Sequence, residues 1–189
     1  MSARKSTAPL ALAVVVGALL LLVAAASLWV TRGLDTPAAG SDEPHPAPPA
    51  TLVWSLTLPD TQGAHQPMAQ WRGKVLVVNF WATWCPPCRE EMPGFSRVQT
   101  KYGPRGVQVV GWSIDTLNNV IQFQNDAPVV YPLLIGTMDL VDRSVAWGNS
   151  AQAMPFTAIF GRDGQLASVH LGRMSEDALE RAIKALLGP

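Results

Sequence analysis

The chain is 189 residues long, which is the length of one domain. Its 14 basic and 14 acidic side chains give a formal net charge of zero, so the charge balance does not indicate binding to nucleic acid. With two cysteines and three scattered histidines, the chain has neither a disulfide framework nor four clustered ligands for structural zinc.

The N-terminal part of the chain predicts a membrane segment. Residues 9–30, "PLALAVVVGALLLLVAAASLWV", carry no charge and are long enough to cross a bilayer as a helix. Arg4 and Lys5 precede this run, which favours a cytoplasmic segment at 1–8 and a domain on the other side. The alternative is a cleaved signal peptide, with "AAAS" at 24–27 as a small-residue cleavage site. Both alternatives export the domain.

A proline-rich linker follows over residues 31–50, which include "LDTPAAGSDEPHPAPPA". The linker has too few apolar residues to form a core, so we expect a semi-rigid spacer. The folded domain is predicted to span residues 51–188.

The first half of this domain should place a buried strand beside a helix. Residues 52–60 and 65–71 predict an N-terminal strand and a second short segment around a turn at 61–63. The apolar run "VLVVNF", 75–80, predicts a buried strand. A helix is expected to begin near Cys85.

The second half alternates strands and helices. Its predicted elements are a buried strand at 106–115, a helix at 117–126, an extended piece at 129–136, a helix at 139–148, a hairpin at 156–172 with its turn at Arg162-Asp163-Gly164, and a helix at 175–188 with Ser175 as its N-cap.

The only two cysteines, Cys85 and Cys88, stand three residues apart at the start of the first helix. A structural disulfide that closes so short a loop would add about 2 kcal/mol at best to the free energy of unfolding. Inert buried thiols are the other alternative. A redox dithiol accounts better for the spacing, because a helix N-terminus lowers the pKa of a thiol. We expect Cys85 to attack and Cys88 to resolve, with Pro86 and Pro87 accepted in the first helical turn.

The stretch "FWATWCPPCREEMP", 80–93, resembles the thioredoxin superfamily, and most closely the membrane-anchored, extracytoplasmic TlpA-like and ResA-like thiol-disulfide reductases. The resemblance covers about residues 51–188. It implies an α/β thioredoxin-like fold, in which helices flank a central mixed sheet. It further implies an N-terminal strand extension, a strand–helix insert at about 114–136 and an N-terminal transmembrane helix.

The resemblance also implies roles near the dithiol. Pro155 would be the cis-proline that faces the two cysteines, leaving the backbone of Met154 free to pair with an extended substrate. An ordinary trans proline at a strand start is the alternative. Phe156 departs from the threonine that usually follows this proline. Trp84 and Pro86 would contact the substrate.

Glu91 is the predicted proton carrier. It lies three residues after Cys88, on the same helix face, as the glutamate of the anchored reductases does. The alternative is a solvated side chain, as expected for Glu90. Many thioredoxins have a buried aspartate where this chain has Asn79. Because an amide does not titrate, we expect Asn79→Ala to leave the pH profile almost unchanged.

The direction of electron flow is predicted to be reduction of protein disulfides. Pro86 and Pro87 offer no donor to stabilise a thiolate, which favours a reductant, although exported dithiols tend to be oxidised. By resemblance, we expect a membrane electron donor like the DsbD and CcdA proteins, and a domain on the outer side of a bacterial inner membrane. Substrates would be cysteines of apocytochrome c or of an oxidase copper site. Alternatives are a dithiol oxidase or isomerase, and a metal-handling or haem-handling chaperone. No cofactor and no metal are expected.

Overall fold

The computed structural model of the protein describes residues 51–188. The predicted segments 1–8, 9–30 and 31–50 therefore lie outside the described residues. Within the described part of the chain, no helix combines the length and the apolar character needed to cross a bilayer.

The described chain consists of strands and helices that alternate only from β3 to β6. In order, these are α2 (Thr51–Ser55), β1 (Thr57–Pro59), β2 (His65–Pro67), β3 (Val75–Trp81), α3 (Pro86–Tyr102), β4 (Val107–Ser113), α4 (Leu117–Asp126), β5 (Leu133–Ile135), α5 (Met138–Ser144), β6 (Phe156–Phe160), β7 (Leu166–Leu171) and α6 (Glu176–Leu187).

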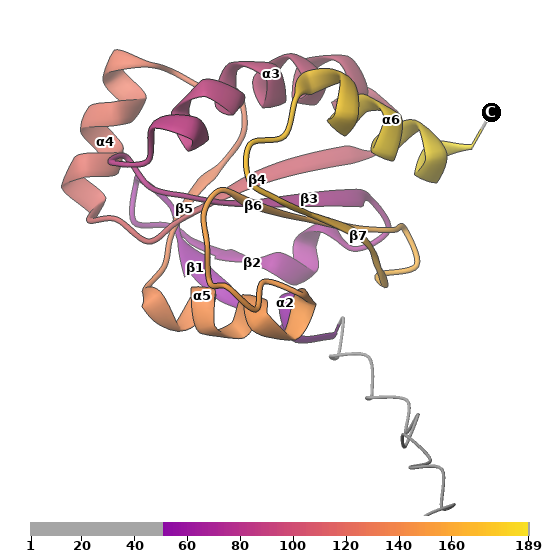
Figure 1. Ribbon diagram of the computed structural model, residues 1–189, viewed down its shortest axis with the longest axis horizontal. Helices are drawn as coiled ribbons and strands as arrows, with labels where there is room; N and C mark the ends of the chain where they lie inside the picture. Colours follow the sequence, from indigo (N-terminus) through magenta and orange to yellow (C-terminus); the bar gives the residue numbers. More distant parts are fainter. Residues whose placement is uncertain (1–50, 189) are drawn as a thin grey trace, which may run out of the picture. The chain divides into compact units, whose positions relative to one another are not determined.

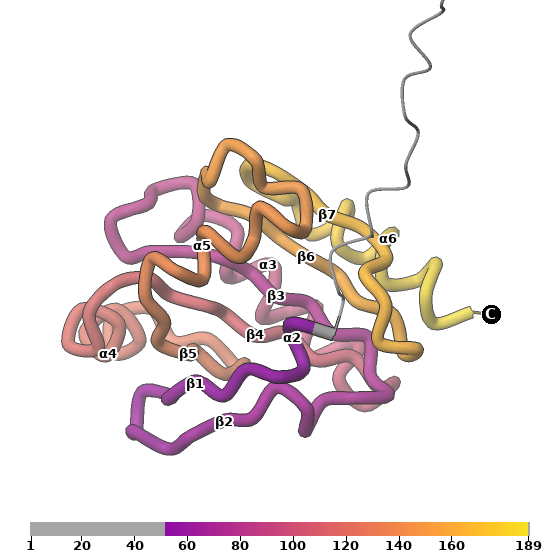
Figure 2. Tube along the Cα trace, turned by 90° about the horizontal axis from the view of Figure 1, so that it is seen from below, coloured from indigo at the N-terminus to yellow at the C-terminus, as the bar shows by residue number. Residues whose placement is uncertain are grey.

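A five-stranded mixed sheet in the order β5-β4-β3-β6-β7 forms the centre of the fold. The strands β3, β4 and β5 run parallel, whereas β6 and β7 pair antiparallel to their neighbours. Helices α3, α4 and α6 cover one face of this sheet, and α2, α5 and the β1–β2 hairpin lie against the other (Figure 1). Figure 2 shows this second face nearest the viewer. The predicted thioredoxin-like α/β architecture is thus confirmed.

Strand β3 is buried along its whole length, because it has a strand on each side and helices on both faces. Successive side chains of a strand point to opposite faces. Val77 and Trp81 accordingly join the core beneath α3, while Leu76, Val78 and Phe80 join the core on the α5 side. This alternation fixes which β3 side chains can reach the helix that follows.

The predicted N-terminal strand at 52–60 is wrong in its first half. Residues 51–55 form the short helix α2, and only Thr57–Pro59 is extended. Val53 and Trp54 are both buried, which two consecutive residues of a one-sided strand cannot be. The Trp54 indole donates a hydrogen bond to the Gly164 carbonyl at 2.9 Å, so a contact distant in sequence holds this turn in place.

The remaining elements agree with the sequence patterns. Helix α4 and strand β5 occupy the region predicted for the strand–helix insert at 114–136. The hairpin of β6 and β7 and the helix α6 are also confirmed, and the Ser175 hydroxyl accepts a hydrogen bond from the backbone of Ala178 as an N-cap does.

Candidate active site

Cys85 and Cys88 form a disulfide at the point where β3 has ended and α3 begins. Their Cα atoms are 5.3 Å apart, and Cys85 is the N-cap residue of α3. Cys85 is 5% exposed and Cys88 is fully buried. Cys85 is thus the sulfur nearer to solvent, on the helix end where backbone N–H groups lack helical partners. The predicted position of the pair at a helix N-terminus is confirmed.

The residues before the disulfide are held by a contact to the insert. Thr83 donates its hydroxyl hydrogen to the carboxylate of Asp115, which also accepts from Asn119 and from the backbone of Thr116. Burial alone would raise the pKa of Asp115, but these hydrogen bonds outweigh it and lower the pKa. The insert therefore anchors the loop that carries the reactive sulfur.

The two predicted substrate-contacting residues next to Cys85 are both exposed. Trp84 is 64% exposed directly before Cys85, and Pro86 is exposed directly after it. A large apolar side chain in this position is available to a partner protein.

Pro155 lies at the same end of the sheet as the disulfide. The β3–β6 register pairs Phe80 with Phe156, so Pro155 is one step beyond the pairing, next to the end of β3. The Met154–Pro155 peptide bond is cis, as predicted. Met154 is half-buried and packs against the core cluster that contains both cysteines.

Glu91 lies on α3 one helical turn after Cys88 and is buried, being only 3% exposed. Its Oε2 accepts a hydrogen bond from the backbone N–H of Met174 at 2.7 Å, and its Oε1 accepts from Asn79 Nδ2 at 2.7 Å. Burial raises its pKa to about 7, although both hydrogen bonds and the charge of Arg173 act to lower it. A carboxyl group with this pKa can release or accept a proton near neutral pH.

Two sequence-based expectations are corrected here. The solvated alternative for Glu91 is wrong, whereas Glu90 is exposed as expected, with Arg173 3.7 Å away. The premise of the Asn79→Ala expectation is also corrected, because Asn79 hydrogen-bonds the titrating carboxylate. The amide does not titrate, but it changes the pKa of its neighbour.

The sequence analysis missed the other groups that surround Glu91. Met174 contributes a backbone N–H, and Thr157 contacts Asn79, so neither shows a pattern of its own in the sequence. The one available signal was Asn79 itself, a polar residue inside an apolar strand. Tyr131 is also buried, and burial together with the Glu91 charge raises the pKa of its phenol above the ordinary range.

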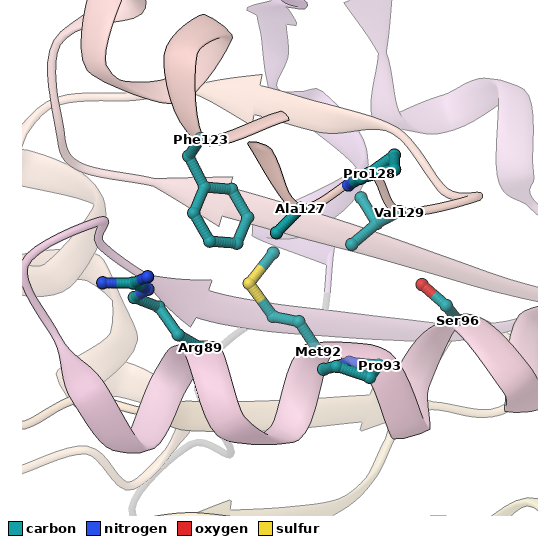
Figure 3. A pocket seen from close by; sticks show the side chains of 8 residues that line it. All are labelled: Arg89, Met92, Pro93, Ser96, Phe123, Ala127, Pro128 and Val129. Atoms are coloured by element: carbon teal, nitrogen blue, oxygen red, sulfur yellow. The ribbon is translucent and has the colours of Figure 1, made fainter. Parts of the chain in front are cut away.

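A hollow of about 370 Å³ opens between α3 and the segment that follows α4. Figure 3 shows the side chains of Arg89, Met92, Phe123 and Val129 directed into it. The Arg89 guanidinium lies 5.8 Å from the centre of the Phe123 ring. The lining of the hollow is mostly apolar, and one of its residues, Arg89, directly follows Cys88 in the chain. Within residues 51–188, no three His, Cys, Asp or Glu side chains gather as a metal site requires.

The mixed sheet, the disulfide at a helix N-terminus and the adjacent cis-proline define a protein of the thioredoxin-like class. The chain belongs to the Redoxin family, whose model matches residues 43–187.

Curated relatives agree with this assignment. The chain is 26% identical over 168 residues to the thiol-disulfide oxidoreductase ResA of Bacillus subtilis (strain 168), covering 86% of each chain. It is also 26% identical over 132 residues to ResA of Geobacillus kaustophilus, covering 69% of this chain and 74% of the relative.

Solved structures show the same architecture. A thioredoxin-family thiol:disulfide interchange protein from Chlorobium tepidum TLS matches with a TM-score of 0.65 and 29% identity, over 71% of this chain and 94% of the other. A thioredoxin-related protein from Neisseria meningitidis serogroup B matches with a TM-score of 0.59 and 31% identity, over 68% and 97%. The protein is a ResA-like and TlpA-like thiol-disulfide oxidoreductase of the thioredoxin superfamily.

Proposed function

We propose that this oxidoreductase reduces disulfides in other proteins through the dithiol form of Cys85 and Cys88. The observation that carries the proposal is the disulfide at the start of α3, spaced by Pro86 and Pro87. Strongly oxidising dithiols owe their potential to a stabilised thiolate in the reduced form. Two prolines supply neither a backbone N–H nor a polar side chain for that purpose.

The reaction proceeds in two exchange steps. The Cys85 thiolate attacks one sulfur of the substrate disulfide, so a mixed disulfide forms and the other substrate sulfur leaves as a thiolate. Cys88, once deprotonated, attacks the Cys85 sulfur and releases the second substrate sulfur. Two electrons pass from the dithiol to the substrate, and the protein is left with its Cys85–Cys88 disulfide.

Glu91 accepts the proton of Cys88 in the second step. Cys88 is fully buried and gains its reactive form only by losing a proton. Glu91 lies one helical turn further along α3 and has a pKa of about 7, so it is suited to take up this proton near neutral pH.

The substrate lies over the exposed side of Cys85. Trp84 and Pro86 present apolar surface beside this sulfur, and the backbone of Met154 pairs with an extended segment that contains the substrate cysteine. Apocytochrome c and the copper-site cysteines of an oxidase are the substrates that the family resemblance suggests.

We further propose that the domain works outside the cytoplasm, anchored by residues 9–30 and supplied with electrons by a membrane donor that resembles the DsbD and CcdA proteins. The uncharged run, with Arg4 and Lys5 before it, supports this topology. Membrane fractionation of the full chain tests it. Recovery of a soluble protein that starts near Ser27 would show that the segment is a cleaved signal.

A redox titration against glutathione tests the direction of electron flow. The expected potential is closer to that of thioredoxin, about −270 mV, than to that of a strong oxidant, about −120 mV. A value above roughly −170 mV would show that the protein is an oxidant rather than a reductase.

A further inference from the structure

Asn79 is a polar residue where the fold alone would favour an apolar one. It stands inside β3, whose seven residues are all buried, and it is itself fully buried. Among the described residues its Oδ1 atom has no hydrogen-bond partner. A buried acceptor without a partner reduces stability. The presence of an amide therefore calls for a reason other than packing.

The NH₂ group of the Asn79 amide, by contrast, has a partner for each of its hydrogens. Asn79 Nδ2 donates to Glu91 Oε1 at 2.7 Å and to Thr157 Oγ1 at 3.2 Å, so both of its hydrogens have an acceptor. Thr157 pairs with Asn79 in the β3–β6 register and is fully buried as well. An ionised carboxylate only accepts hydrogen bonds, so the NH₂ group of the amide, rather than its oxygen, faces Glu91.

We propose that Asn79 is a positioning residue, whose amide holds the Glu91 carboxylate in place beneath the disulfide and stabilises its charged form. Asn79 acts only through Glu91, and its effect on catalysis rests on the proposed role of Glu91 as the acceptor of the Cys88 proton. Together with the Met174 N–H, the amide gives one donor to each carboxylate oxygen. Strand β3 and the loop before α6 thereby converge on one carboxyl group of α3.

Other groups also face Glu91 and must stay constant in a test. On α3, Cys88 lies three residues before it. The loop between β7 and α6 contributes the Arg173 charge, which favours the carboxylate. The loop before β5 contributes the buried phenol of Tyr131. None of these groups is altered by a substitution at Asn79.

An amide suits this position better than the alternatives. An aspartate would place a second carboxylate within hydrogen-bond distance of Glu91, and two such groups retain a shared proton at neutral pH. A leucine would fill similar space but donate nothing. Both substitutions should therefore raise the pKa of Glu91. The leucine variant should still fold, because an apolar side chain suits the buried strand β3.

The test is a titration of the Glu91 side-chain carboxyl carbon by NMR, in oxidised protein labelled with ¹³C-glutamate. The Glu91→Gln variant identifies the signal. Asn79→Leu should shift the apparent pKa upward by about one to two units, because a hydrogen bond to a charged group is lost. Asn79→Asp should yield two coupled steps, the later of them above the wild-type pKa. Asn79→Ala serves as the second variant if Asn79→Leu does not fold.

Val78→Ala is the matched control, since it loosens the same strand but points to the opposite face. It should leave the Glu91 signal at its wild-type position. A shift below about 0.3 units in Asn79→Leu, or an equal shift in Val78→Ala, would overturn the proposal.

This titration needs no substrate and no turnover. If the protein proves to be an oxidant, the glutathione titration gives a potential above roughly −170 mV, while Asn79→Leu still shifts the Glu91 pKa. If Asn79 is only structural, the potential is retained while the shift is missing. The pH profile of substrate reduction then gives the functional readout, and its inflection near neutral pH should move upward in Asn79→Leu by the same amount as the carboxyl signal.

Discussion

The two faces of β3 differ in what they contribute. Toward α5, the strand presents Leu76, Val78 and Phe80, and the Phe80 ring packs edge-on against Trp112 and Trp147 with centroids 5.2 and 6.1 Å apart. Toward α3, the strand places a polar amide between apolar neighbours, beneath a buried carboxyl group and a disulfide. One strand thus supports an aromatic core on one side and the chemistry on the other.

Because side chains alternate in direction along β3, the residues that stabilise the fold lie on one face and the residues that support the reaction lie on the other. Edge-on aromatic pairs add favourable energy to the area they bury. A buried carboxyl group, by contrast, costs free energy whenever it is charged. Packing on the aromatic face can therefore offset the free energy that the buried carboxyl group costs on the α3 face. Substitutions on the two faces should have different consequences.

The largest expected effect is on the α3 face, at the disulfide. Cys85→Ser should reduce disulfide-reductase activity to the background rate, because the attacking sulfur is gone. Cys88→Ser should accumulate long-lived mixed disulfides, because nothing remains to resolve them. An insulin-reduction assay measures the loss of activity, and non-reducing gels of protein recovered from cells measure the trapped mixed disulfides. Better trapping by Cys85→Ser than by Cys88→Ser would mean that the proposed order of attack is reversed.

On the aromatic face, Phe80→Ala should lower the free energy of unfolding by about 3–5 kcal/mol, because it leaves a cavity among the packed rings. Urea denaturation measures the loss. Val130→Ala, at a side chain that is 63% exposed, is the control and should change stability by less than about 0.5 kcal/mol. The Glu91 pKa should be the same in both variants. A change in it after Phe80→Ala would break the separation between the faces.

Glu91 should make stability depend on pH. Its pKa is raised by burial from 4.5 to about 7, so the folded protein holds the proton more tightly than the unfolded chain. This contribution is fully present below pH 4.5 and is lost as pH rises through 7, which amounts to about 3 kcal/mol. Urea denaturation of the oxidised protein at pH 5 and pH 8.5 should reveal the loss in wild type but not in Glu91→Gln.

The exposed neighbour supplies the control for this experiment. Glu90→Gln removes one carboxyl group from the surface of the same helix and should keep the wild-type pH dependence of stability.

Glu91→Gln should also lose the inflection near pH 7 in the rate of substrate reduction. If Glu91→Gln matches wild type across this range, Glu91 carries no proton in the reaction.

The smallest expected effect is at Trp84. Trp84→Ala should change the free energy of unfolding by less than about 0.5 kcal/mol, because the side chain is 64% exposed. It should raise KM for the reduction of insulin by about 5-fold to 30-fold, as loss of an exposed aromatic contact does. Hydroxyethyl disulfide, a small disulfide with no peptide segment that could pack on the indole, should be reduced at the wild-type rate. An equal effect on both probes would contradict a role in protein binding.

Much of this molecule could be predicted from local patterns. The run "VLVVNF" followed by a cysteine pair and two prolines predicted a buried strand, a helix and a redox site, because each feature depends on residues close in the chain. The hairpin turn and the Ser175 cap were predictable for the same reason. The helix α2 was not, since Trp54 bonds to Gly164 across the fold.

The sequence by itself determined the fold class, the position of the dithiol and the identity of the glutamate one helical turn beyond it. Only the tertiary structure decided that Glu91 is buried rather than solvated, and which groups hold it. Burial depends on α6 and its preceding loop closing over α3, where Met174 and Glu91 meet from positions 83 residues apart. The pKa of Glu91 is a sum over such distant contacts, so no local pattern contains it.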